Sequence, residues 1–257
     1  MNPQLILFDM DDTLSHCNIY FDMVIDQFSD QLTTWFASYK IAAGAVKDKQ
    51  YEIDTLGVTE LGFTEDHFPI SLVETYRYFS KMTGRPESEE EAEGLLQLGR
   101  SVYDRNVEPY PDMVETLTRL RDEGHELFLY TGGVESIQKR KVETLRLGDF
   151  FGDRIFIRQH KNSDALEAIL RDNQFDRSRS WMVGNSLRTD ILPALERGIK
   201  AIYVPAIREW DYNIVELTVK PEGAYFTVPT LKDVPGTINS YLNGQFVSEP
   251  GEQIAGN

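Results

Sequence analysis

The feature that most constrains this chain is a short apolar run that ends in three carboxylates. Residues Leu5–Phe8 are uninterrupted apolar side chains, a pattern typical of a strand buried on both faces of a parallel sheet and too short for a helix. Asp9, Asp11 and Asp12 follow within four positions. Like charges this close repel, and burying one is costly without a partner, so a divalent cation at the end of the strand is the natural resolution. A solvated acidic turn is the alternative interpretation.

Strand-like and helix-like segments alternate between Pro109 and Pro205. The links between them are short, which is the pattern of βα units that build a parallel sheet. Further along, residues 224–227 and 231–242 indicate a last edge strand and a last helix. The predicted strands of the alternating part are residues 126–130, 154–158, 180–183 and 200–204.

A region of different character separates the first strand from this alternation. Apolar residues recur at helical spacing over residues 19–39 and 69–82. Ser88–Glu91 matches a capping box, which predicts a third helix. The pattern over residues 40–62, which two glycines interrupt, is less clear. The region as a whole therefore indicates a compact helical insertion.

These patterns predict a doubly wound, Rossmann-like α/β core with an inserted all-α domain. The core is expected to comprise residues 1–15 and 107–243, and the helical insertion residues 16–106. Residues 244–257 are polar and contain glycine, and are expected to form a tail. Because parallel strands share a carboxyl edge, where open α/β sheets bind ligands, polar groups that follow the strands are expected to meet there.

Composition and charge exclude several classes of function. The 257-residue chain carries a net charge of −16, which argues against binding nucleic acid or an anionic membrane surface. A small phosphorylated ligand is still compatible, because a local metal and lysine outweigh distant charge. Cys17 is the only cysteine, and no apolar run is long enough to span a bilayer. The expected location is the cytoplasm, and the oligomeric state is not readable.

The strand that ends at Tyr130 is followed by Thr131, Gly132 and Gly133. A hydroxyl and bare backbone amides can hydrogen-bond a phosphate oxygen, and the next helix points its N-terminus at the same place. A role for Thr131 as a helix cap explains the same residues. The pattern therefore indicates a phosphate site without requiring one.

Lys161 stands directly before a helix start at Asn162. A cation at this position is unfavourable unless an anion lies between it and the helix. Lys161 is therefore a candidate for binding an anionic group. Lys139 and Lys141 compete for this role but lie inside a predicted helix rather than at its start.

The segment Phe8–Leu14 resembles the first motif of the haloacid dehalogenase-like superfamily, Asp-x-Asp-x-Thr after an apolar strand. Thr131 and Lys161 match the second and third motifs in the family's order. The fourth motif is Gly-Asp-x-x-x-x-Asp or similar, and here Asn185 stands at its first acidic position while Asp190 supplies the second. A helical insertion directly after the first motif resembles the family's first type of cap domain.

This resemblance implies a magnesium-dependent hydrolase of small phosphorylated metabolites that acts through an aspartyl-phosphate. Asp9 would attack phosphorus and Asp11 would serve as the acid and base. Thr131, Gly132 and Lys161 would hold the phosphoryl group. A phosphomutase of the same superfamily is one alternative, and a non-catalytic phosphate- or metal-binding protein is another.

The metal implied by the resemblance is Mg2+, which takes oxygen ligands and usually only one or two carboxylates. We predict a site made by Asp9, the Asp11 carbonyl and Asp190, with Asn185 among the direct ligands or beside them. An amide oxygen can coordinate but brings no charge. Asparagine at position 185 should therefore weaken the metal rather than exclude it.

Overall fold

The computed structural model describes residues 2–219, 223–245 and 254–255. The chain divides into two compact units. One, called here the core unit, contains the residues up to His16 and those from Val107 onward. The other, the helical unit, is Cys17–Asn106.

The core unit is built on a sheet of seven strands in the order β3-β2-β1-β4-β5-β6-β7. All six neighbouring pairs are parallel, so every strand ends at the same edge. The chain adds strands on one side of β1 and then returns to add the rest on the other side, which is the doubly wound arrangement that was predicted. The strands are β1 (Leu5–Phe8), β2 (Glu126–Gly132), β3 (Ile155–Arg158), β4 (Ser180–Gly184), β5 (Lys200–Tyr203), β6 (Tyr225–Thr227) and β7 (Ile254–Ala255).

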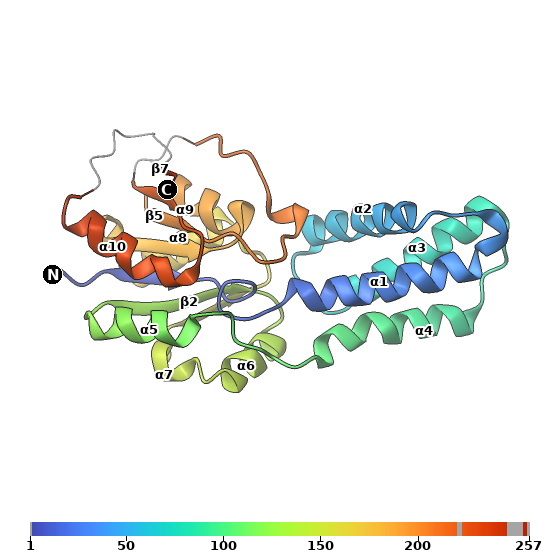
Figure 1. Ribbon diagram of the computed structural model, residues 1–257, viewed down its shortest axis with the longest axis horizontal. Helices are drawn as coiled ribbons and strands as arrows, with labels where there is room; N and C mark the ends of the chain where they lie inside the picture. The colour runs from blue at the N-terminus through green and yellow to red at the C-terminus, as the bar shows by residue number, and fades with distance from the viewer. Residues whose placement is uncertain (1, 220–222, 246–253, 256–257) are drawn as a thin grey trace. The chain divides into compact units, whose positions relative to one another are not determined.

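Both faces of β1 are buried, as its unbroken apolar run predicted. Ile6 and Phe8 pack into a cluster with residues of α5, α7 and α10, whereas Leu5 and Leu7 pack into a second cluster with residues of α8 and α9. The two clusters thus place α5, α7 and α10 on one side of the sheet and α8 and α9 on the other, and Figure 1 labels all five helices. The helices of the core unit are α5 (Met113–Asp122), α6 (Glu135–Thr144), α7 (Gly148–Phe151), α8 (Ser163–Asp172), α9 (Leu192–Glu196) and α10 (Val234–Leu242).

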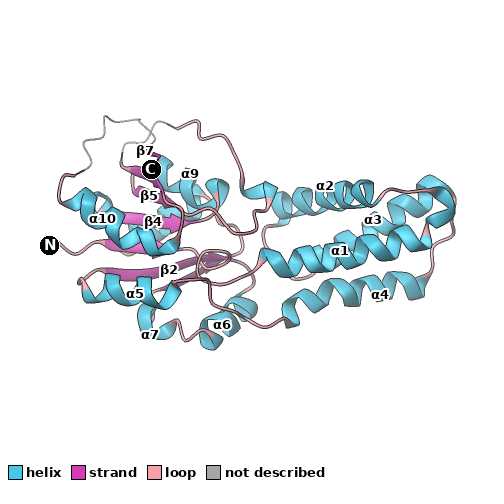
Figure 2. Cartoon of the chain, viewed as in Figure 1, coloured by secondary structure: helices cyan, strands magenta, loops and turns pink. Residues whose placement is uncertain are grey.

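The helical unit consists of four α-helices with its own apolar core and, over residues 17–106, no strand (Figure 2). The less clear segment 40–62 forms one helix of 19 residues. Gly57 lies within this helix and does not interrupt it. A Cβ at this position would lie 1.8 Å from the His67 ring. The glycine therefore allows close approach of two helices. The helices are α1 (Asn18–Trp35), α2 (Ala43–Leu61), α3 (His67–Thr83) and α4 (Glu89–Arg100).

Two boundaries differ from the sequence-based expectation. The helix expected to begin at Asp190 is preceded by a π-helical turn, Leu187–Ile191, and regular helix starts only at Leu192. Ser186 caps this turn by accepting a hydrogen bond from the Thr189 N–H at 3.0 Å. Of the predicted tail 244–257, residues 246–253 and 256–257 lie outside the described part of the chain. Residues 254–255 of the expected tail instead form the short strand β7, which pairs with β6.

Candidate active site

The groups that follow β1 are presented by a tight turn at the carboxyl edge of the sheet. The Asp9 N–H still belongs to the sheet and donates to the Val183 carbonyl at 2.9 Å. The chain then turns back, and the Ser15 N–H donates to the Met10 carbonyl at 2.9 Å. Asp9 is thereby fixed at the end of the strand, and Asp11 lies within the turn.

Lys161 joins two acidic groups of the site in one buried cluster. Its Nζ donates to Asp9 Oδ1 at 2.5 Å and forms an ion pair with Asp190. The side chains are 2% exposed for Lys161, 8% for Asp9 and 0% for Asp190. One cation thus faces two carboxylates away from bulk water, so the ionised cluster keeps a net negative charge that a further cation would offset.

Burial dominates the electrostatics of this cluster. It raises the pKa of Asp9 from its ordinary value to about 7, against the opposing attraction of Lys161. Burial by itself lowers the pKa of Lys161, but the carboxylates of Asp190 and Asp9 outweigh it and hold that pKa above the ordinary range. Lys161 therefore stays protonated, while ionised Asp9 is held at a cost that a further cation would reduce.

Three oxygen atoms converge beside Asp9 in a way that suits a magnesium ion. The side-chain oxygen of Asn185 lies 3.2 Å from Asp9 Oδ2 and 3.0 Å from the Asp11 carbonyl. Adjacent ligands of one magnesium ion are about 2.9 Å apart, given Mg–O distances of about 2.0–2.1 Å at right angles. If the amide is turned over, its nitrogen donates to the same two oxygens instead. The donor set therefore fits Mg2+ with the amide oxygen facing inward.

Asp190 lies in the site but is held by protein groups. One carboxylate oxygen accepts from the Ser186 N–H at 2.9 Å, and the other pairs with Lys161. A Cβ at Gly184 would lie 2.2 Å from that carboxylate, so glycine at the end of β4 makes room for it. Within the described residues no three His, Cys, Asp or Glu side chains gather as a metal site. Direct coordination by Asp190 stays a prediction.

Helix α6 contributes two groups that the sequence did not single out for this role. Gln138 donates to Asp11 Oδ2 at 2.9 Å and to the Thr131 hydroxyl at 2.7 Å. Lys141 donates to Asp11 Oδ1 at 2.6 Å. Lys139, the other lysine of this helix weighed against Lys161, is exposed and pairs with Glu135. The i, i+3 spacing of Gln138 and Lys141 after the Thr-Gly-Gly turn is the signal that indicates a shared face.

The structure thus gathers the sequence-predicted residues at one edge of the sheet. Asp9, Lys161 and Asp190 are in direct contact, and Asn185 touches the oxygens of the first loop. Thr131, which is fully buried, reaches Asp11 through Gln138. The Gly132 carbonyl accepts from the same amide at 2.8 Å.

Comparison with known proteins identifies the family. The profile of haloacid dehalogenase-like hydrolases matches residues 3–197. The chain belongs to this family. The family resemblance inferred from the sequence is thereby confirmed.

Two curated relatives of this hydrolase carry names of phosphatases. It is 31% identical over 137 residues to a glyceraldehyde 3-phosphate phosphatase from Methanothermobacter thermautotrophicus, covering 50% of this chain and 60% of that protein. It is 26% identical over 230 residues to a provisionally named pyrophosphatase, PpaX, from Caldanaerobacter subterraneus subsp. tengcongensis, covering 88% of this chain and 90% of that protein.

A solved haloacid dehalogenase-like hydrolase from Xanthomonas campestris shares the fold. It superposes with a TM-score of 0.75 at 22% identity and covers 95% of this chain and 93% of its own. Among the described helices of the present hydrolase, none is long and apolar enough to cross a membrane.

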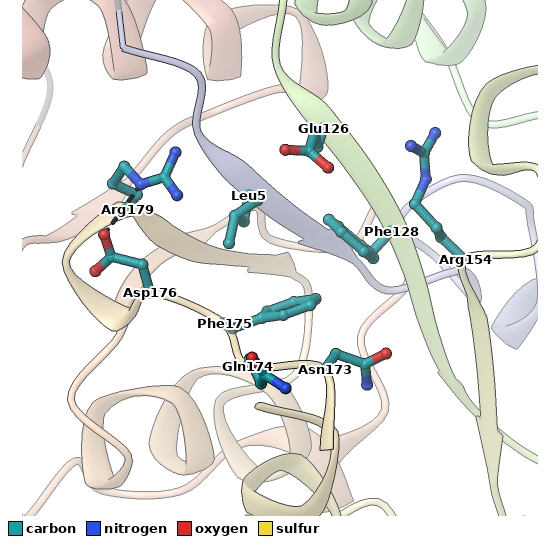
Figure 3. A pocket seen from close by; sticks show the side chains of 9 residues that line it. All are labelled: Leu5, Glu126, Phe128, Arg154, Asn173, Gln174, Phe175, Asp176 and Arg179. Atoms are coloured by element: carbon teal, nitrogen blue, oxygen red, sulfur yellow. Dashed lines mark hydrogen bonds and ion pairs between the residues drawn. The ribbon is translucent and has the colours of Figure 1, made fainter. Parts of the chain in front are cut away.

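A hollow of 340 Å³ lies at the opposite edge of the sheet, where β1 and β2 begin (Figure 3). Leu5, Phe128 and Phe175 supply its apolar lining. Its two arginines, Arg154 and Arg179, donate to backbone carbonyl groups of the protein. Their charges are thus partly used in holding loops, and none of the predicted site residues lines this hollow.

Proposed function

We propose that this protein hydrolyses small phosphate monoesters through an aspartyl-phosphate on Asp9. The observation that carries the proposal is the Asp9–Lys161 contact at 2.5 Å, at the edge of the sheet where Asp11 and Thr131 also lie. A carboxylate nucleophile with a cation and hydroxyl beside it is suited to attack a phosphoryl group. The names of the two relatives support phosphate chemistry.

Asp9 and Asp11 divide the reaction into two steps. A carboxylate oxygen of Asp9 forms a bond to phosphorus, and the bond from phosphorus to the ester oxygen breaks with its electron pair staying on that oxygen. Asp11 donates a proton to the departing oxygen. In the second step Asp11 accepts a proton from water, whose oxygen attacks phosphorus and releases phosphate and the free Asp9 carboxylate.

Residues around Asp9 bind the transferred group without entering the bond changes. The Lys161 ammonium supplies positive charge, and the Thr131 hydroxyl and the backbone at Gly132 supply hydrogen bonds. Because Lys161 also pairs with Asp190, its position is set before a substrate arrives. Preorganised charge in a buried site is a principal source of rate acceleration in phosphoryl transfer, because it does not have to reorganise as the reaction proceeds.

A magnesium ion would be held by Asp9, the Asp11 carbonyl and Asn185, with Asp190 engaged directly or through water. When bound, the ion supplies positive charge that offsets the charge of the phosphoryl oxygens. It also reduces the cost of keeping Asp9 ionised.

The helical unit is proposed to be a cap that selects the substrate and excludes water during phosphoryl transfer. The net charge of −16 is unsuited to binding nucleic acid. The proposed substrates are therefore small phosphorylated metabolites. A phosphomutase would use the same aspartyl-phosphate but return the phosphate to its product. Release of inorganic phosphate, measured against formation of an isomer, separates the two.

Replacing Asp9 by asparagine tests the proposal. Asp9→Asn should lower hydrolysis of p-nitrophenyl phosphate with Mg2+ by more than about 10³-fold, because an amide cannot form the covalent intermediate. Asp149→Asn, a change at an exposed carboxylate of α7, should leave the rate unchanged. Circular dichroism should be the same for all three proteins. Substantial turnover by Asp9→Asn would remove Asp9 as the nucleophile.

A further inference from the structure

Gln138 connects three groups of the site through a single nitrogen. Its Nε2 lies 2.7 Å from the Thr131 hydroxyl, 2.8 Å from the Gly132 carbonyl and 2.9 Å from Asp11 Oδ2. The residue is 2% exposed. A buried amide with short contacts to two loops has a defined orientation, since any other rotamer would leave buried acceptors unpaired.

Gly133 provides the space that Gln138 occupies. Its φ is +140°, a conformation that residues with a Cβ rarely adopt. A Cβ at this position would lie 2.9 Å from Gln138 Cδ. The second glycine of the Thr-Gly-Gly turn thus serves the placement of Gln138 as well as the turn itself.

Lys141 completes the hold on Asp11 from the next turn of the same helix. Its Nζ lies 2.6 Å from Asp11 Oδ1, and its side chain is 14% exposed. Gln138 and Lys141 therefore take one carboxylate oxygen each. Because they are three residues apart in α6, they present their side chains on one helix face.

We propose that Gln138 and Lys141 are positioning residues that hold the Asp11 carboxylate where the ester oxygen departs. The inference rests on the proposed phosphatase function. The Ser15 hydroxyl of the first loop also reaches this carboxylate, but at 3.4 Å, so the shorter contacts from α6 set its direction. Gln138 is the fixed partner because it is also tied to Thr131 and Gly132. Lys141, on a flexible stem, leaves Oδ1 while that oxygen carries the proton, and pairs with it again once the proton has passed to the ester oxygen.

A positioning role predicts a loss that depends on the leaving group. Departure of p-nitrophenolate needs little help from an acid, whereas departure of an unsubstituted phenol depends on proton transfer from Asp11. A change that only loosened the structure would lower both rates together. The ratio of the two rates therefore reports on Asp11, independently of overall damage to the site.

The test compares kcat/KM for p-nitrophenyl phosphate and phenyl phosphate, with Mg2+, in wild type and four variants. Gln138→Leu, which keeps the size but removes the donor, should lose at least about 100-fold on phenyl phosphate and less than about 10-fold on p-nitrophenyl phosphate. Lys141→Met should also lose more activity on phenyl phosphate than on p-nitrophenyl phosphate, but to a smaller extent. Lys141→Arg should restore the wild-type ratio of the two rates. Lys139→Met, the matched change on the exposed side of α6, should alter neither rate.

Equal losses on both esters in Gln138→Leu and Lys141→Met, or no loss in either, would overturn the inference while leaving the phosphatase proposal intact. If Gln138→Leu does not fold, the pair Lys141→Met and Lys141→Arg decides alone. Wild-type protein that hydrolyses neither ester would instead refute the proposed function, and the inference with it.

Discussion

Removal of the Lys161 charge should strongly destabilise the core unit. In Lys161→Met the carboxylates of Asp9 and Asp190 lose their shared cation, and their side chains are 8% and 0% exposed. Breaking a buried ion pair by removing one partner costs about 3–5 kcal/mol, because the remaining charge stays buried and unpaired. Against a total stability of roughly 5–15 kcal/mol, this is a large fraction.

The loss should grow with pH. In the metal-free wild type the pKa of Asp9 is already raised from 3.8 to about 7, and without Lys161 it should rise further. The folded state then binds a proton that the unfolded state has released, so the stability of both proteins falls as pH rises above about 4. In wild type this fall ends near pH 7, whereas in Lys161→Met it continues to the higher pKa of Asp9. The extra loss in Lys161→Met therefore grows above about pH 7 and is fully present once the pH exceeds the pKa of Asp9 in the folded variant. Mg2+ should recover part of it.

Hydrogen exchange of the β1 and β4 amides measures the stability of the core unit by itself. Wild type, Lys161→Met and Lys139→Met would be compared in chelator at pH 5 and at pH 8. The control, Lys139→Met, removes an ammonium group from an exposed ion pair with Glu135, whose side chains are 62% and 70% exposed. It should change the stability of the core unit little. A loss below about 1 kcal/mol in Lys161→Met at pH 8, or one that is equal at both pH values, would refute the reasoning.

Two further predictions concern the metal site and the helical unit. Asn185→Asp should lower the magnesium concentration for half-maximal turnover and Asp190→Asn should raise it, because each change alters the negative charge at the site. An unchanged midpoint in Asp190→Asn would show that this residue only holds Lys161. In the helical unit, burial raises the pKa of Asp54 to about 6, against the attraction of His67. The stability of the helical unit should therefore fall as pH rises from about 4 to 6. Asp54→Asn should remove this slope and raise the stability at pH 7.5 by up to about 3 kcal/mol, as measured by hydrogen exchange of α2 and α3. An unchanged slope in Asp54→Asn would show that Asp54 is not its source.

The residues that form the candidate site could be named from the sequence because their signals are local. An apolar run that stops at Asp9 and Asp11 predicts both a buried strand and where it ends. A lysine directly before a helix cap, as at Lys161, is an unusual arrangement that can be recognised from a few neighbouring residues. Parallel strands share an edge, so these separate signals were enough to predict that the groups meet.

Contacts between distant segments could not be predicted in the same way. Helical periodicity indicates which face of a helix is apolar, but it does not say what a polar residue on that face will touch. Gln138 and Lys141 bind Asp11 across sequence separations of 127 and 130 residues. Only the packing of α6 beside the end of β2 brings them together, which is why the sequence shows Lys141 only as a lysine inside a helix.

Two local sequence patterns were misleading because tertiary contacts compete with them. The Ser88–Glu91 capping box is only half formed: Ser88 Oγ accepts from the Glu91 N–H at 3.3 Å, but the Glu91 carboxylate binds Arg85 at 2.6 Å. Gly57 weakened the helical pattern of its segment, yet α2 runs through it, and a side chain at this position would collide with the His67 ring. The sequence by itself indicated strands β1–β6, most helix starts and the candidate reactive groups, since these depend on neighbours in the chain, but it did not indicate β7 or the helix start at Leu192. The partners of those groups were decided only by the tertiary structure, because each contact depends on where the rest of the chain has packed.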